Sequence, residues 1–288
     1  MEVNSQYITI AALKPATISK ANINLKMKPT LNIIKIGGNV IDNPRFLERF
    51  LIDFSSLSAS KILIHGGGKI ATKIAVKLDV ETKMVEGRRI TDLPMLEVVT
   101  MVYGGLVNKQ IVAKLQSLSC NAIGLTGADG GVILAKKRPV REIDFGYVGD
   151  VEKVDNVIIK NFIENHLTPV FAPLTYDTEG NILNTNADTQ ASAVAVAMSG
   201  DYEVNLIYCF EKKGVLSNPE DNDSVIATII PASYADYKAA GTINAGMIPK
   251  LDNAFAALQK GVSKVIICHA DELKQAVAEG TSGTQIIL

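Results

Sequence analysis

Short apolar runs alternate with amphipathic stretches from Leu31 to the end of the chain. Several runs, such as Ile62–Ile64, have no polar interruption, which is typical of strands that helices cover on both faces. We expect strands at Leu31–Ile36, Lys61–His65, Ala122–Leu125, Gly131–Ala135, Tyr147–Val151, Pro169–Ala172, Asn205–Cys209, Ile226–Ile230, Lys264–Cys268 and Thr284–Ile287.

Between these runs, apolar residues recur at the spacing of a helix face. The repeats are Ile70–Ile74–Leu78, Ala191–Val194–Ala195–Met198 and Phe255–Leu258–Val262. Pro94 suits the first turn of a long helix that runs to about Leu118. The Gly104–Gly105 pair inside that helix indicates close packing or a bend.

Alternation of strands and helices predicts an α/β fold with an open, mostly parallel sheet. Ligands of such folds bind at the carboxyl ends of strands, against helix N-termini. Residues 1–27 have no clear period, and Met27 could itself be the start of translation. We treat 1–27 as an N-terminal extension, which is either dispensable or an arm that swaps between subunits.

Composition narrows the functional classes. The 288 residues contain 29 Lys and Arg against 30 Asp and Glu, so neither extended nucleic-acid binding nor a polybasic membrane anchor is expected. No apolar run is long enough for a membrane span, and no secretory signal opens the chain. Three scattered cysteines in apolar runs favour buried thiols in the cytoplasm, and no Cys or His spacing predicts a protein-built metal site.

Two glycine turns follow predicted strands. Lys35 to Asn39 (KIGGN) ends the first strand, and His65 to Lys69 (HGGGK) joins the second strand to a helix. Glycines let backbone N–H groups approach a ligand closely, and three in a row at a helix N-terminus can enclose an anion. Neither turn fits the P-loop or dinucleotide fingerprint.

Two further turns lead into helices. Asn184 to Asp188 (NTNAD) holds more amide and carboxylate groups than a helix cap needs, and Gly246 to Lys250 (GMIPK) carries a lysine. Two lysines, two glycine turns and a carboxylate, without an obvious nucleophile, are suited to phosphoryl transfer, where positioning and charge neutralisation dominate.

With these motifs, the chain resembles the N-acetylglutamate kinase family of the amino acid kinase superfamily. The similarity covers about 31–288 and includes IIKIGG, ILIHGGGK, VEGRRITD, LNTNAD and GMIPK in the family's order. It implies a three-layer αβα sandwich with two lobes, placed here at 28–200 for the acylated amino acid and 201–288 for the nucleotide. It also implies ATP-dependent phosphorylation of the γ-carboxylate of an N-acylated glutamate in arginine biosynthesis, with Mg²⁺ held through the phosphates.

The resemblance also implies residue roles. Lys35 and Lys250 would stabilise the transferring phosphoryl group, and Asp188 would hold both lysines. Backbone N–H groups of the glycine turns would bind phosphate, at Gly37, Gly38 and Gly66, and the substrate, at Gly67 and Gly68. Arg89, Asn184 and Asn186 would bind the substrate α-carboxylate.

The chain departs from the family at three places. Glu211 stands where an Asp precedes the Gly214-Val-Leu run, so the nucleotide contacts of Glu211 and Gly214 are less certain to carry over. Arg88 stands where relatives usually have a neutral residue or a histidine. It could be a solvated side chain or could pair with the extra carboxylate of an N-succinyl substrate. The short C-terminal end favours an arginine-insensitive homodimer over a hexamer.

Two alternatives remain open. Another amino acid kinase, acting on carbamate, aspartate or glutamate, is disfavoured by the HGGG turn and Arg89. A non-catalytic ligand-binding relative is disfavoured because Lys35, Asp188 and Lys250 are all present.

Overall fold

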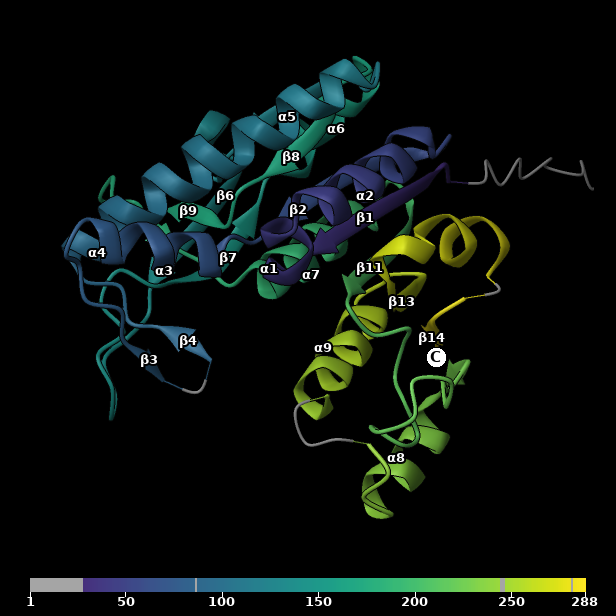
Figure 1. Cartoon of the computed structure of the whole chain (residues 1–288). Helices are drawn as coiled ribbons and strands as arrows, with labels where there is room; N and C mark the ends of the chain where they lie inside the picture. The colour runs from purple at the N-terminus through teal and green to yellow at the C-terminus, as the bar shows by residue number, and fades with distance from the viewer. Residues whose placement is uncertain (1–27, 86, 244–246, 281) are drawn as a thin grey trace, which may run out of the picture.

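The main sheet has eight strands and lies at the centre of the molecule (Figure 1). The computed structural model describes residues 28–85, 87–243, 247–280 and 282–288. In sheet order the strands are β12 (Thr228–Ile229), β14 (Thr284–Ile286), β13 (Lys264–His269), β11 (Glu203–Phe210), β1 (Thr30–Ile36), β2 (Ser60–His65), β8 (Thr168–Phe171) and β5 (Ala122–Leu125). All neighbouring pairs are parallel except β13 with β14, so the predicted mostly parallel sheet is confirmed.

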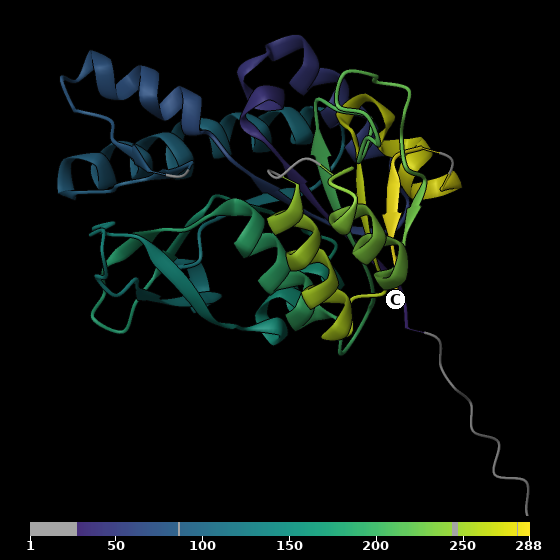
Figure 2. The same cartoon turned by 90° about the horizontal axis from the view of Figure 1, so that it is seen from below.

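Helices cover both faces of this sheet. They are α1 (Gly38–Asp42), α2 (Pro44–Ser56), α3 (Gly68–Lys77), α4 (Leu93–Val99), α5 (Asn108–Ser117), α6 (Asn156–Glu164), α7 (Ala187–Met198), α8 (Pro231–Ala239) and α9 (Ile248–Gln259). In Figure 2 the purple and blue helices lie above the strands, whereas the green α7 and yellow-green α9 lie below them. The predicted helical repeats fall in α3, α7 and α9, except that Leu78 and Val262 lie just after the ends of α3 and α9.

Alternate residues of each strand enter different cores, as the period of two requires. In β1, Leu31 and Ile33 pack with α7 and α9, whereas Ile34 and Ile36 pack with α1 to α5. Each of these four side chains is fully buried. The uninterrupted apolar runs of the sequence are therefore explained by two cores, one on each face of a single sheet.

The predicted long helix is present but changes its winding. Between α4 and α5, residues Thr100–Val107 form a π-helical segment, η1, that contains Gly104 and Gly105. A Cβ at Gly104 would lie 3.4 Å from Leu174 Cδ1, so this glycine sits in a close contact. Gly104 thus confirms the close packing that the sequence offered as one of two alternatives, whereas the π-helical winding was not predicted.

A second, smaller sheet was not predicted as a separate unit. It consists of β10 (Ile182–Asn184), β9 (Leu174–Tyr176), β6 (Ile133–Lys137) and β7 (Gly149–Val154), and is mainly antiparallel. Two predicted strands shift here: the one expected at Gly131–Ala135 begins at Ile133, and the one expected at Tyr147–Val151 begins at Gly149. The first shift follows from a 3₁₀ turn, η2 (Asp129–Gly131), in which Gly130 and Gly131 have positive φ. A hairpin of β3 (Met84–Val85) and β4 (Arg88–Arg89) was also not foreseen.

The proposed boundary between the two lobes, at 200/201, runs through the main sheet. β1 pairs along its length with β11, which follows that boundary, so one sheet continues across both halves. The division into 28–200 and 201–288 stays a prediction, and the extension 1–27 lies outside the described residues.

All three cysteines are buried free thiols, as expected. Cys209 and Cys268, distant in sequence, are neighbours on β11 and β13 with their sulfurs 3.8 Å apart. Burial raises the pKa of the Cys209 thiol, with Cys268 contributing in the same direction. Within the described residues, no helix combines the length and the apolar character that a membrane span needs.

Candidate active site

Lys35 and Asp188 form an ion pair at the carboxyl end of the main sheet. Lys35 lies on the face of β1 that carries Leu31 and Ile33, and therefore points toward α7. Its Nζ is 2.7 Å from Asp188 Oδ1, and Lys35 is only 7% exposed. Asp188 is in the first turn of α7, where the helix dipole favours a negative charge.

Lys250 approaches the same carboxylate from the first turn of α9. Burial lowers the pKa of Lys250; Lys35 lowers it further, whereas Asp188 and Glu211 raise it. Phe210, at the end of β11, lies between the two lysines, with its ring centroid 3.7 Å from Lys250 Nζ and 5.3 Å from Lys35 Nζ. Two ammonium groups at two helix N-termini thus face one carboxylate, which leaves a net positive site for an anion.

The two glycine turns adjoin each other beside these lysines. A Cβ placed on Gly66 would lie 3.8 Å from the backbone nitrogen of Gly38. At Gly67, with φ of 153°, a Cβ would lie 2.9 Å from the Tyr103 ring. Larger residues would therefore fill the space beside the turn or displace the helix behind it.

Arg89 is buried and anchored to the second glycine turn. Its Nη2 donates hydrogen bonds to the Gly68 carbonyl at 2.9 Å and to Thr72 Oγ1 at 2.8 Å. Asn184 Nδ2 donates to Thr91 Oγ1 at 2.9 Å. These bonds fix the groups expected to bind the α-carboxylate before any ligand enters.

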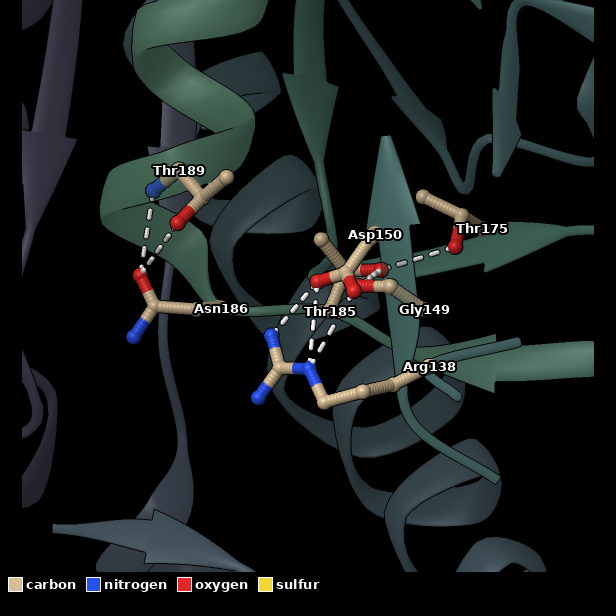
Figure 3. Close-up of polar contacts among 7 residues, drawn as sticks. All are labelled: Arg138, Gly149, Asp150, Thr175, Thr185, Asn186 and Thr189. Atoms are coloured by element: carbon tan, nitrogen blue, oxygen red, sulfur yellow. Dashed lines mark hydrogen bonds and ion pairs between the residues drawn. The ribbon is translucent and has the colours of Figure 1, made fainter. Parts of the chain in front are cut away.

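Asn186 serves partly as a helix cap. Its Oδ1 accepts from the Thr189 backbone N–H at 3.0 Å, whereas its amide nitrogen points away from the helix (Figure 3). Asn186 can therefore cap the helix through its Oδ1 and still offer its amide nitrogen to a ligand. The preceding Thr185 is fixed by contacts of its hydroxyl with Thr175 Oγ1 at 2.8 Å and with the Gly149 carbonyl at 3.3 Å.

Three cavities meet at this cluster and share lining residues. The first, of about 180 Å³, is lined by the second glycine turn, Arg89 and the Asn184–Asn186 turn. The second is lined by Asp188 and Lys250, and it shares Arg88 and Asn186 with the first. The third, of about 290 Å³, contains Glu211 and Gly214, and it shares Phe210 and Lys250 with the second. Lys250 thus lines two adjoining cavities, and Lys35 pairs with Asp188 in the lining of the second.

Arg138 is a site residue that sequence reasoning missed. It follows β6 and lines the first cavity. Its Nε lies 3.2 Å from both carboxylate oxygens of Asp150, and its Nη2 lies 2.5 Å from Oδ1 (Figure 3). Nothing in the local sequence marks this arginine, because only the second sheet brings it to the cavity.

Arg88 and Arg138 line the same cavity from different elements. Arg88 belongs to the β3–β4 hairpin and is exposed. Among the described residues, those that line this cavity include Arg88, Arg89 and Arg138 but no Asp or Glu. Asp150 offsets the charge of Arg138 from outside the lining, so the excess of positive charge comes mainly from Arg88 and Arg89.

Further charged groups surround Glu211, which lines the third cavity. Burial raises the pKa of Glu211, but a hydrogen bond from Asn39, its own backbone and the nearby Lys250 and Lys69 hold that pKa below its usual range. Lys69 Nζ donates to Asn39 Oδ1 and lies 3.9 Å from Asp42 Oδ2. The sequence placed Lys69 and Asn39 in the glycine turns without assigning them a role.

His65 supports the second glycine turn from the opposite face of the sheet. It is fully buried, its Nδ1 is 2.7 Å from the Gly66 carbonyl, and its Nε2 is 3.1 Å from Asn108 Nδ2. Burial lowers the pKa of His65 to about 4; the Gly66 contact opposes this shift, and Lys109 adds to it. The imidazole is therefore neutral at pH 7.

The described residues contain no group of three or more His, Cys, Asp or Glu side chains that could hold a metal ion.

Comparison with known proteins agrees with this geometry. The profile of the amino acid kinase family matches residues 30–269. An acetylglutamate kinase of Cytophaga hutchinsonii is 58% identical over 259 residues, covering 89% of this chain and 98% of that protein. One from Bacteroides thetaiotaomicron is 54% identical, with 88% and 98% covered.

Solved structures show the same fold. A Streptococcus mutans structure, smu.665, has a TM-score of 0.70 at 31% identity, with 89% of this chain and 98% of that chain covered. A Giardia lamblia carbamate kinase has a TM-score of 0.69 at 15% identity, with 90% and 98% covered. The chain belongs to the amino acid kinase family and, within it, to the acetylglutamate kinases.

Stability should depend on pH through His65. The ordinary pKa near 6.5 applies to the unfolded chain and about 4 to the folded one, so protonation favours unfolding. The stabilisation is complete above pH 6.5 and is lost as the pH falls from 6.5 to 4, by up to about 3 kcal/mol.

Urea unfolding at pH 7 and pH 4.5 would measure the loss of unfolding free energy. We expect His65→Asn to lose less than wild type, because it lacks the titrating imidazole. His166→Asn, at an exposed histidine, is the matched control. If wild type and His65→Asn lose the same free energy of unfolding between the two pH values, the interpretation is wrong.

Proposed function

We propose that the protein transfers the γ-phosphoryl group of ATP to the γ-carboxylate of an N-acylated glutamate, with N-acetyl-L-glutamate as the primary candidate. The product would be an acyl phosphate in arginine biosynthesis. The observation that carries this proposal is that Lys35 pairs with Asp188 while Lys250, near the same carboxylate, lines two adjoining cavities. The relatives named acetylglutamate kinase support the same reaction.

The acyl-amino acid would occupy the first cavity. Arg89, Asn184 and Asn186 would bind its α-carboxylate, and the glycine turns would hold its γ-carboxylate near the lysines. That carboxylate is ionised at neutral pH, so no strong general base is required. The obstacle is repulsion between two anions, which the ammonium groups and backbone N–H groups reduce.

ATP would occupy the third cavity, with its phosphates directed toward Lys250 and the glycine turns. Glu211 and Gly214 line this cavity and are the proposed nucleotide contacts. When bound, Mg²⁺ neutralises phosphate charge, and its ligands would be phosphate oxygens and water because the protein offers no cluster of its own among the described residues.

The other amino acid kinases are less well supported. Similarity to carbamate kinase is at 15% identity, which concerns the fold alone. A non-catalytic role is disfavoured because Lys35 and Asp188 form an ion pair and the charge of Asp188 also acts on Lys250.

Lys250→Ala tests this assignment. It should lower kcat by about 10²- to 10³-fold with less effect on KM, because the charge acts mainly as the phosphoryl group moves. Steady-state ADP release would measure this, with Lys77→Ala at an exposed lysine as the control. A folded Lys250→Ala protein with wild-type kcat would refute the assignment.

The lining of the first cavity also favours a second candidate substrate, which differs from N-acetylglutamate in its acyl group. N-acetylglutamate has two carboxylates, which the α-carboxylate site and the glycine turns would hold. Arg88 then remains at the cavity, and it could pair with the third carboxylate of N-succinyl-L-glutamate, whereas Arg138 is already paired with Asp150.

Arg88→Leu should lower the ratio of kcat/KM for N-succinyl- to N-acetyl-glutamate. A charge-assisted hydrogen bond is worth about 1.5–3 kcal/mol, or roughly 10- to 150-fold in this ratio. Arg141→Leu, at an exposed arginine that lines none of the three cavities, is the control. An unchanged ratio would mean that Arg88 does not recognise the acyl group.

We also propose a cytoplasmic, arginine-insensitive homodimer. Exposed apolar side chains along the long helix, at Leu93, Met101 and Leu106, support contact with a second copy. Light scattering should give the dimer mass with and without arginine, and an arginine-inhibited hexamer would contradict the proposal.

A further inference from the structure

His65 and Lys35 lie at the ends of adjacent strands but face opposite layers. Ile36 pairs with His65 across β1 and β2, so the two strands end side by side. Ile62 and Ile64 enter the core beside α7, and His65, at the alternate position, faces α5. His65 therefore does not reach the phosphoryl site itself, and any influence on catalysis must pass through the glycine turn that follows it.

A hydrogen-bonded chain holds the imidazole between two backbone carbonyls. Asn108 Nδ2 lies 2.9 Å from the Val170 carbonyl and 3.1 Å from His65 Nε2, while His65 Nδ1 lies 2.7 Å from the Gly66 carbonyl. Carbonyl oxygens only accept, so the group at each end of the chain must donate. Asn108 therefore donates to Nε2, and the imidazole carries its proton on Nδ1.

The Gly66 carbonyl belongs to the same rigid peptide plane as the Gly67 N–H. The two groups point in opposite directions across a trans peptide, so fixing the carbonyl also fixes the direction of the N–H. Gly66 and Gly67 both line the first cavity. Within the described part of the chain the Gly67 N–H has no protein acceptor, so it remains a donor for a ligand.

The long helix fixes this arrangement from behind. Tyr103 and Val107 of η1 pack where a Cβ of Gly67 would lie, and Asn108 follows them at the start of α5. Lys109 Nζ holds the Asn108 side chain from its other end, donating to Oδ1 at 3.2 Å. Two successive residues of this helix thus support the glycine turn: Val107 packs beside Gly67, and Asn108 contacts His65.

We propose that His65 is a positioning residue, whose Nδ1–H holds the Gly66 carbonyl so that the Gly67 N–H is aimed at the substrate oxygen that receives the phosphoryl group. This inference rests on the proposed function, which places that oxygen at the glycine turn. Asn108 is the second member of the device, because it selects the tautomer.

The tautomer can be measured without activity. ¹⁵N NMR of the full-length wild type at pH 7 should show His65 neutral, with the proton on Nδ1 and none on Nε2. A neutral imidazole protonated on Nε2, or an imidazolium, would overturn the proposal.

Two variants separate positioning from general support of the fold. In His65→Asn the amide nitrogen can take the place of Nδ1, whereas in His65→Gln it takes the place of Nε2 and does not reach Gly66. We expect His65→Asn to stay within about 5-fold of wild-type kcat and His65→Gln to lose roughly 10- to 100-fold, because one aimed N–H donor is lost. KM for ATP should change little in either variant.

Circular dichroism and urea unfolding would first show that both variants are folded. Equal kcat values for the two, or a loss that simply follows their stability, would overturn the positioning role. Wild-type protein that phosphorylates no acyl-glutamate would instead refute the proposed function, and the tautomer measurement would remain a separate test of the hydrogen-bonded chain.

Discussion

The ion pair between Lys35 and Asp188 is the interaction on which the rest of the site depends. A nearly buried ammonium is costly unless a carboxylate compensates it, and here that carboxylate is supplied by the first turn of the neighbouring helix. Lys35 is the penultimate residue of β1 and Asp188 is the second residue of α7, so the pair links the end of this strand to the start of the helix. Lys250 adds a second positive charge from α9. Two lysines and one carboxylate carry a net positive charge, which an anionic ligand would neutralise.

Charge therefore explains how the fold serves transfer between two anions. The protein has a formal net charge of only −1, yet the described lining of its first cavity contains three arginines, one of them paired with Asp150. Backbone N–H groups add to this positive potential without side-chain charge. The second cavity shares lining residues with both the first and the third, and it contains Lys250 and Asp188, the partner of Lys35. In the proposed reaction, the positive charge would therefore lie where the two anions must approach.

Much of this was predictable because the relevant signals are local. Buried parallel strands give uninterrupted apolar runs, and the turns after them carry glycines and lysines that a solvated loop would not need. Lys35, Asp188 and Lys250 could be chosen because each ends or begins an element. The family resemblance then supplied their roles, which residue spacing alone could not.

The remainder depends on contacts between residues distant in sequence. Arg138 reaches the cavity only through the second sheet, whose short strands gave weak patterns that misplaced their starts. From the sequence, His65 is only the first residue of a glycine turn. Its contact with Asn108 could not be predicted, because Asn108 lies 43 positions away, after a π-helical segment.

Trapping of the product with hydroxylamine tests the central claim, that this site phosphorylates a carboxylate, most directly. The account predicts that wild-type protein with ATP and N-acetyl-L-glutamate or N-succinyl-L-glutamate forms one hydroxamate for each ADP released. Release of ADP without hydroxamate from either substrate would contradict it.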